Sequence, residues 1–323
     1  MLMIRYFVLE NKKLSPAKEY IYDKITWCDV VKPSEAELID IVQKFKLNLE
    51  DLEDCLDETI RPRFTTDLIL GYQMVVLRIA RFMDVDLEKP STEPFGIVIT
   101  KDGKIITIHA SIPPYFNEIV EALQRVQPEN DFIMVLDLVH YLIDQLAMTA
   151  QKITMKIREL ENKVLQSHSA RDIHEPFKLN AFFIYFVTSM LGNLNTIRAF
   201  SHKHASLKDK DILAYEKLDD VITDMEQVFQ YSSIYRDSLN NILDAYASVI
   251  NNNLTTVMKI VGSLTLILTI PGIIASVYGM NVNLWIPNDP GDPSSYFVFP
   301  AIIGGTILTC LLLYSRFRKA NWL

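Results

Sequence analysis

A stripe of polar and small side chains follows one long helical segment near the C-terminal end of the sequence. Its members recur at alternating intervals of four and three residues: Asp237, Asn241, Asp244, Ser248, Asn251, Thr255, Met258, Gly262, Thr265, Thr269, Gly272, Ser276 and Gly279. A coiled coil carries apolar residues at this spacing and buries them between helices. Every member here except Met258 is polar or small. One interpretation of this stripe is that its oxygen atoms line a water-filled path for ions. The alternative is that its small residues allow two helices to pack closely.

The acidic members of the stripe favour the wet path. Asp237 and Asp244 belong to a polar stretch of about four turns that precedes the apolar part of the helix. Repeated aspartates in a dry interface would repel each other. The stripe therefore predicts the wall of a water-filled pore, surrounded by copies of the same helix. Because one such helix encloses nothing, we expect a cyclic homo-oligomer, in which heterologous contacts close a ring.

Two uncharged stretches at the C-terminus predict two membrane spans. Lys259 is the last charged residue before Asp289, which leaves 29 uncharged residues at 260–288, and a second uncharged stretch of 23 residues covers Pro293–Ser315. About 20 mostly apolar residues cross the hydrocarbon layer as a helix. We place the first span at 256–281 and the second at 296–315.

The basic residues predict the orientation of these spans. The connecting loop, 282–295, contains Asp289 and Asp292 but no lysine or arginine, whereas Lys259 and the basic tail at 316–323 flank the spans on the other side. The positive-inside rule then places both termini in the cytoplasm. The net charge of −8 argues against a nucleic-acid partner and favours attraction of cations.

Residues 1–130 mix strand and helix signals and predict an α/β domain. The expected elements are strands at Met3–Glu10, Ile25–Val31 and Leu68–Arg81, a helix from Ser34 to about Leu47, and a hairpin of Phe95–Thr100 and Lys104–His109. Ser34 is a suitable N-cap, and Asp102-Gly103 is a strong hairpin turn signal. The cysteines Cys28, Cys55 and Cys310 have no metal-site spacing and are interpreted as reduced packing residues.

Residues 131–255 predict a cytoplasmic helical and stalk region. Apolar residues at three- and four-residue spacing favour helices from Asp131 to about Gln166 and from Ile173 to about Ser201. A third helix begins near Asp211 and has no glycine or proline before Gly262, so we expect it to continue into the first span. The predicted fold class is an α+β cytoplasmic domain, a long helical stalk and two C-terminal transmembrane helices.

The segment Pro271–Asn281, which ends in Tyr278-Gly279-Met280-Asn281, resembles the CorA family of magnesium transporters. The segments Arg61–Phe64 and Leu243–Tyr246 support the likeness, which extends over essentially the whole chain. The resemblance implies a homopentameric funnel in a prokaryotic inner membrane, surrounded by lipid. It also implies uptake of Mg²⁺, with Co²⁺ and Ni²⁺ as further cargo, and no organic cofactor. The two uncharged stretches contain no Asp, Glu, His, Lys or Arg, which favours passive flux.

The resemblance also assigns roles to individual residues. Gly279, Met280 and Asn281 would form the selectivity filter, with Asn281 holding the hydrated ion, although an asparagine here also suits a helix C-cap. The pore-lining residues would be Thr255, Met258, Val261, Gly262, Thr265, Thr269, Gly272 and Ser276, with Met258 and Val261 as a hydrophobic constriction. Asp220 and Asp244 on the stalk, with Asp84 or Asp86 from the α/β domain, would bind regulatory Mg²⁺.

Two other functions remain open at this point. The loop after Asn281 departs from the usual family sequence and zinc-transporting relatives share the architecture, so a zinc or broad divalent carrier is the first alternative. His202-Lys203-His204 contains two potential zinc ligands, but in a charged helix-to-loop segment we interpret them as a solvated pair. A membrane-anchored sensor is the second. We find no nucleophile elbow, catalytic carboxylate pair or Gly-rich cofactor loop that would indicate an enzyme.

Overall fold

The chain divides into two compact units. The computed structural model describes residues 4–17, 20–81, 87, 89, 91–166, 174–280 and 295–322. Unit 1 comprises Met1–Ser167 and Arg171–Leu243, and unit 2 comprises His168–Ala170 and Asp244–Leu323. Helix α7 (Ile212–Tyr278) contributes residues to both units.

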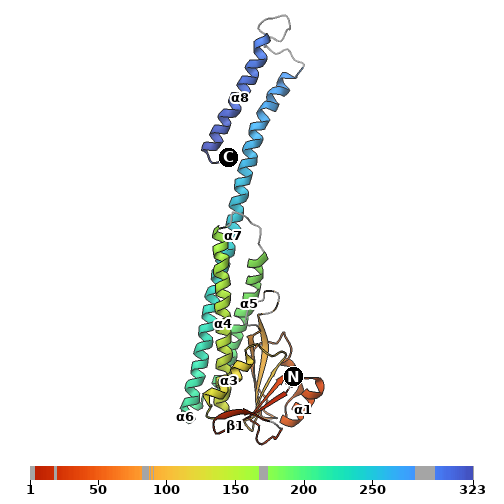
Figure 1. Cartoon of the computed structure of the whole chain (residues 1–323), viewed down its shortest axis with the longest axis vertical. Coiled ribbons are helices and arrows are strands. Elements are labelled where there is room, and N and C mark those ends of the chain that lie inside the picture. The colour runs from red at the N-terminus through yellow and green to blue at the C-terminus, as the bar shows by residue number, and fades with distance from the viewer. Residues whose placement is uncertain are drawn as a thin grey trace. The chain divides into compact units, whose positions relative to one another are not determined.

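Unit 1 is built on a seven-stranded mixed sheet (Figure 1). Its strands are β1 (Ile4–Glu10), β2 (Lys13–Pro16), β3 (Trp27–Val31), β4 (Arg63–Thr66), β5 (Gln73–Ala80), β6 (Thr92–Ile99) and β7 (Ile105–His109). Their order across the sheet is β2-β1-β3-β7-β6-β5-β4. The β3–β7 pair is parallel and the other neighbouring pairs are antiparallel.

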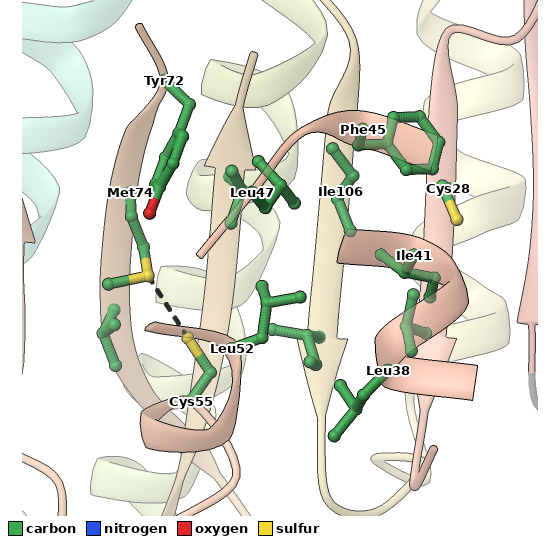
Figure 2. Close-up of a cluster of buried hydrophobic side chains, with 14 residues drawn as sticks. Cys28, Leu38, Ile41, Phe45, Leu47, Leu52, Cys55, Tyr72, Met74 and Ile106 are labelled. Atoms are coloured by element: carbon green, nitrogen blue, oxygen red, sulfur yellow. Dashed lines mark hydrogen bonds between the residues drawn. The ribbon is translucent and has the colours of Figure 1, made fainter. Parts of the chain in front are cut away.

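Helices cover both faces of this sheet. They are α1 (Glu35–Phe45), α2 (Leu49–Asp54), α3 (Phe116–Val126), α4 (Asp131–Gln166) and α5 (His174–Lys203), and the short α6 (Leu207–Lys210) lies between α5 and α7 in the chain. On one face, Leu38 and Ile41 of α1 and Leu52 of α2 pack with Met74 and Ile106 of the strands (Figure 2). On the other face, α4 and α5 contact β5. The result is a three-layer α/β domain.

The sequence predicted several of these elements closely. Ser34 is the N-cap of α1, and its side chain accepts a hydrogen bond from the Glu37 backbone N–H while Glu37 accepts one from the Ser34 N–H at 2.8 Å. This capping box satisfies two helix-end donors at once. The hydrogen bonds from Ser34 lower the pKa of the Glu37 carboxyl. The hairpin of β6 and β7 also has the expected turn, with Gly103 at a φ of 80°.

The strand expected from Leu68 starts later than predicted. The Asp67 side chain accepts hydrogen bonds from the backbone N–H groups of Ile69 and Leu70 at 2.8 and 2.7 Å, and Gly71 has a φ of 81°. These contacts form a turn, because an aspartate that binds the backbone just after it competes with strand pairing. Strand β5 therefore begins at Gln73.

Close packing at Gly96 gives a first testable prediction. A Cβ atom at Gly96 would lie 2.5 Å from the Cys55 Sγ atom and 2.7 Å from the Ile108 Cγ2 atom. Both neighbours are fully buried, so Gly96→Ala should lower the free energy of unfolding by about 1–3 kcal/mol through overpacking. Thermal unfolding of the purified chain measures this. The control is Gly103→Ala, whose cost comes from its positive φ and not from crowding; an unchanged midpoint for Gly96→Ala would contradict the packing argument.

Unit 2 contains the rest of α7 and helix α8 (Ser295–Lys319). Within the described residues, three helices are long and apolar enough to cross a membrane: α4, α7 and α8. The apolar window of α4 is 61% buried inside the protein, whereas those of α7 and α8 are 6% and 0% buried. Helix α4 therefore belongs to the core of unit 1, and α7 and α8 present the apolar surface that a bilayer would cover.

Candidate functional site

The polar stripe on α7 is exposed in the single chain. All eight predicted pore-lining residues are exposed: Thr255, Met258, Val261, Gly262, Thr265, Thr269, Gly272 and Ser276. At Gly262 and Gly272 an added Cβ atom would meet no other atom within 4 Å. Within one chain the stripe therefore has open space in front of it.

Helix α8 covers a different face of α7. A groove of about 700 Å³ between the two helices is lined by Ile267, Ile274 and Tyr278 of α7 and by Ile302 and Cys310 of α8, among others. Ile267 and Ile274 are each two positions from the nearest members of the stripe. At 3.6 residues per turn, their side chains therefore lie about 160° around the helix axis from the stripe. Thr265, Thr269, Gly272 and Ser276 thus point away from α8, whereas Gly279, the last member of the stripe, lines the groove.

A proline in α7 and a cysteine in α8 lie at the contact between the two helices. Pro271 lies inside α7 and has no N–H to donate to the Ile267 carbonyl, four residues earlier. The Cys310 thiol of α8 donates to that carbonyl at 3.6 Å. A carbonyl left unpaired within a bilayer would be costly. Cys310, predicted only as a packing residue, therefore has a specific partner on the face opposite the stripe.

The stripe threonines keep their oxygen lone pairs available. The hydroxyls of Thr255, Thr265 and Thr269 donate to the carbonyls of Asn251, Val261 and Thr265 at 2.8, 2.8 and 2.7 Å. Since each hydroxyl proton is used by the helix, each oxygen is left to accept hydrogen bonds. The water molecules around a hydrated cation are donors, so this row matches the shell of a hydrated cation.

The predicted filter lies at the end of α7. The Gly279 N–H donates to the Ala275 carbonyl at 2.9 Å, and Met280 is 56% exposed. Asn281 lies outside the described residues, as do the loop aspartates Asp289 and Asp292. The roles of Gly279, Met280 and Asn281 stay predictions.

The two predicted stalk carboxylates are solvent-exposed. Asp220 and Asp244 have no ion-pair partner in the part of the chain that the structure describes. They are 24 positions apart on α7, which is more than six turns, so one ion cannot bind both. Asp84 and Asp86 lie outside the described residues. No group of three metal-binding side chains occurs within the described ranges, so an ion at Asp220 or Asp244 would need ligands from elsewhere.

Other stalk carboxylates are used for helix packing in unit 1. The His140 Nδ1 atom on α4 lies 3.1 Å from the Asp224 Oδ2 atom on α7. The Lys217 side chain of α7 pairs with Asp137 of α4. These contacts distinguish the paired residues from Asp220 on the same helix, for which the described residues provide no ion-pair partner.

The potential zinc ligands are not arranged as a site. The His204 Nε2 atom lies 2.8 Å from the Gln73 Oε1 atom, and its ring lies 4.5 Å from that of Phe200 between centroids. Burial, and then the charge of Lys203, lower the pKa of His204. The sequence interpretation of His202 and His204 as a solvated pair is wrong for His204, which packs against the core, while His202 is exposed.

A buried charge network in unit 1 was not predicted. Asp29 is 0% exposed and accepts from Arg5 at 2.6 Å, from Thr107 at 2.7 Å and from His109 Nε2 at 2.9 Å. The His109 Nδ1 atom lies 2.5 Å from the Ser111 carbonyl, which can only accept. Both ring nitrogens of His109 therefore act as donors. Burial raises the pKa of Asp29, but the bond to His109 and the charges of His109 and Arg5 outweigh it and hold that pKa below its ordinary value.

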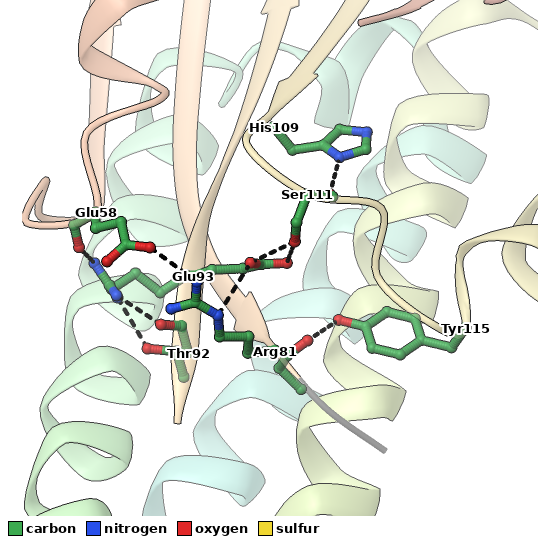
Figure 3. A network of polar contacts seen from close by, with 9 residues as sticks. Glu58, Arg81, Thr92, Glu93, His109, Ser111 and Tyr115 are labelled. Carbon is green, nitrogen blue, oxygen red and sulfur yellow. Dashed lines mark hydrogen bonds and ion pairs between the residues drawn. The ribbon is translucent and has the colours of Figure 1, made fainter. Parts of the chain in front are cut away.

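The same edge of the sheet contains a second buried carboxylate. Glu93 is 3% exposed, accepts from the Ser111 hydroxyl at 2.8 and 2.7 Å, and lies 3.7 Å from the Arg81 Nε atom (Figure 3). Burial raises the pKa of Glu93, against the opposing effects of Ser111 and Arg81. No sequence spacing indicated this network, because its members come from separate strands and loops.

The sequence pattern of the family described as CorA-like Mg²⁺ transporter protein matches residues 22–319. The chain belongs to the CorA family. The cobalt/magnesium transport protein CorA of Methanocaldococcus jannaschii is 23% identical over 305 residues, which cover 93% of this chain and 92% of that protein. The magnesium transport protein CorA of Escherichia coli is 23% identical over 330 residues and covers 99% of this chain and 100% of its own length.

The three-dimensional structure of this chain is also similar to a solved CorA structure. The complete structure of the Methanocaldococcus jannaschii CorA magnesium transporter covers 100% of this chain and 99% of its own chain, with a TM-score of 0.81 and 20% identity. The resemblance found in the sequence is confirmed, as are the α/β domain, the long helix and the apolar C-terminal helix. This chain is thus a member of a family of divalent-cation transporters.

Proposed function

We propose that this chain is the subunit of a homopentameric channel that carries Mg²⁺ passively into the cell, with Co²⁺ and Ni²⁺ as further cargo. The chain would cross the cell membrane twice, with both termini in the cytoplasm. Cytoplasmic Mg²⁺ would act as the regulator. The first-ranking alternative is a zinc or broad divalent carrier on the same scaffold.

One observation carries the proposal: the polar stripe of α7 is open on the face opposite α8. An anchor helix would gain nothing from a row of hydroxyls facing away from its neighbour. In a ring of five α7 helices, with α8 outside, the same row would face a central path. The lone pairs of Thr265 and Thr269 would then accept hydrogen bonds from the waters of a hydrated Mg²⁺, which gives up those waters reluctantly.

The composition of the helices supports passive flux. No ionisable Asp, Glu, His, Lys or Arg lies between Lys259 and the end of α7, nor in α8 before Arg316. Such groups within the membrane usually serve proton relays and ion coupling. For a divalent cation, the membrane potential supplies about 4.6 kcal/mol per 100 mV, twice the single-charge value.

Met258 and Val261 are the proposed gate. They are 67% and 56% exposed on the stripe side of α7, and five copies of each would form an apolar constriction that blocks ions by dewetting. Regulatory Mg²⁺ at Asp220 would hold neighbouring subunits together in the closed state, together with carboxylates of another subunit. Loss of that ion would shift the population toward the open state, because the ion binds the two states with different affinity.

The direct test is ion flux into liposomes that contain the purified chain. We expect uptake of Mg²⁺ that follows an imposed inside-negative potential and is unchanged by a proton gradient. Uptake of Co²⁺, Ni²⁺ and Zn²⁺ measured in the same way shows which ion the protein transports fastest. Uptake of Zn²⁺ that exceeds Mg²⁺ uptake and depends on the proton gradient would support the zinc carrier instead.

The regulatory role of Asp220 is tested by charge reversal. Asp220→Lys should weaken inhibition of flux by Mg²⁺ inside the liposomes by about tenfold or more, because it removes a carboxylate ligand and introduces a repelling charge. Asp219→Lys is the matched control, since Asp219 is equally exposed one position earlier on α7. Inhibition that is the same in both variants and in the unmodified protein would remove Asp220 from the regulatory site.

A further inference from the structure

A large cavity in unit 1 shares no residue with the ion pathway. Its volume is about 940 Å³, and its walls come from the segment before β4 and from helix α5. Apolar and aromatic side chains line part of it, including Ile60, Pro62, Phe182, Tyr185 and Leu191. Small-molecule sites in proteins usually have volumes of about 300–1,000 Å³ and this mixture of apolar walls and a few polar groups.

The cavity is basic although the whole chain is acidic. Arg61 and Arg78 line it, and Glu58 is the one acidic residue among its described lining residues. Glu58 is already bound by Arg81, whose Nη2 atom donates to the Glu58 Oε1 atom at 2.8 Å (Figure 3). Lys89 and Lys178 also line the cavity, but both have interactions within the protein. Arg61 and Arg78 are therefore the two cationic groups that could bind an anionic ligand in this cavity.

The charge of Arg78 is balanced by no carboxylate within ion-pair distance in the described residues. Its guanidinium donates four hydrogen bonds, all to neutral oxygens: Thr92 Oγ1, Thr92 O, Glu58 O and Ile60 O at 2.9, 2.7, 2.9 and 3.0 Å. Since a guanidinium has five N–H donors, one remains. Arg61 is exposed at the rim and has no ion-pair partner in the described chain. Two cationic groups thus line the same cavity, and each has at least one N–H donor that could bind a ligand.

A buried hydroxyl in the cavity wall has no hydrogen-bond partner among the described residues. It belongs to Ser91, which is 2% exposed and whose Oγ atom makes no hydrogen bond there. Buried polar groups are nearly always satisfied in native proteins, so an orphan of this kind calls for a missing partner. An anionic oxygen bound by the arginines would accept the Ser91 proton as well.

We propose that this cavity binds a nucleotide, with its phosphate held by Arg61, Arg78 and Ser91. A guanidinium matches phosphate in geometry and charge. The flat base would pack on the apolar wall formed by Phe182, Tyr185 and Pro62. A phosphate ion alone would make no contact with this wall. The inference does not depend on which cation the protein carries.

The test uses the full chain in detergent micelles with a fluorescent N-methylanthraniloyl ATP. We expect saturable binding measured by anisotropy, in the presence of EDTA so that no divalent cation mediates it. Unlabelled ATP should displace the probe, whereas inorganic phosphate and adenosine should each compete at least about tenfold more weakly, because each makes only part of the contacts. Stronger displacement by phosphatidic acid than by ATP would overturn the nucleotide assignment in favour of a lipid headgroup.

Two variants and one control locate the site. Arg61→Ala should weaken probe binding by about tenfold or more through loss of a charge-assisted contact. Ser91→Ala should leave the ligand-free unfolding temperature equal or higher, because it removes an orphan hydroxyl, but should reduce the temperature rise that ATP produces. Arg125→Ala on α3 is the matched control, because Arg125 is exposed and pairs only with Glu121 in the described chain. Absence of saturable binding, or equal binding by all three variants, would overturn the proposal.

Discussion

Gly272→Leu is expected to abolish most Mg²⁺ uptake while leaving the subunit folded. A Cβ atom at Gly272 meets nothing within 4 Å, so the leucine has room within the chain. Leucine also favours a helix more than glycine does. In the proposed ring, however, five leucines would replace open space in the ion path with apolar side chains. A barrier raised by about 3 kcal/mol lowers the rate about a hundredfold.

The measurement is the initial rate of Mg²⁺ uptake into liposomes that enclose a magnesium-sensitive dye. Gly304→Leu on α8 is the matched control, since a Cβ atom at Gly304 also meets nothing within 4 Å. That variant should transport within about twofold of the unmodified chain, because α8 is proposed to lie outside the path. Full transport by Gly272→Leu would show that the stripe does not face the ions.

Asp29→Ala should destabilise unit 1 more than any surface substitution. It would leave the fully buried His109 and the partly buried Arg5 without their shared carboxylate. Removal of one partner from a buried ion pair costs about 3–5 kcal/mol, which corresponds to a fall in unfolding temperature of about 10 °C for a unit of this size. Intrinsic fluorescence is a direct readout, because the Trp27 indole donates to Thr107 at 2.9 Å, next to Asp29.

The contribution of Asp29 to the stability of the folded chain should also depend on pH. Its pKa is lower in the folded chain than in the unfolded one, so its stabilising contribution is complete above the unfolded value of about 3.9 and is lost as pH falls through the folded pKa. The gap in unfolding temperature between the unmodified chain and Asp29→Ala should therefore be largest near neutral pH and shrink in acid. Asp40→Ala, which removes a partly exposed pair with Lys44, should cost at most about 1 kcal/mol. A gap that widens in acid would contradict the assigned charge of Asp29.

Most elements with strong local signals were predicted from the sequence, although the amphipathic helix α3 was missed. Helices α4 and α5 begin and end within two residues of the expected positions, and the α1 cap at Ser34 was identified. Each has a periodic apolar face or a capping residue, and both signals arise from neighbours within a few residues. Strand β1 and the β6–β7 hairpin were found for the same reason.

Short elements were missed because their signals are weak. Strands β2 and β4 have four residues each, and α2 has six. Such segments show too few alternations to define a period, and their stability comes from pairing with strands elsewhere. β2 is held by β1, and β4 is held by β5. The strand order of the sheet could not be predicted either, since it depends on contacts between distant segments.

The sequence by itself determined the polar stripe, the two uncharged helices and the family, because periodicity, charge and motif are all properties of residues close together in the chain. Only the tertiary structure decided that α8 covers the face of α7 opposite the stripe, through Cys310 and Ile267. It alone brought Asp29 to His109 across 80 positions and placed Arg78 and Ser91 in the wall of the same cavity. These contacts depend on how strands pair and helices pack between segments that are far apart in the sequence, and no local sequence pattern encodes them.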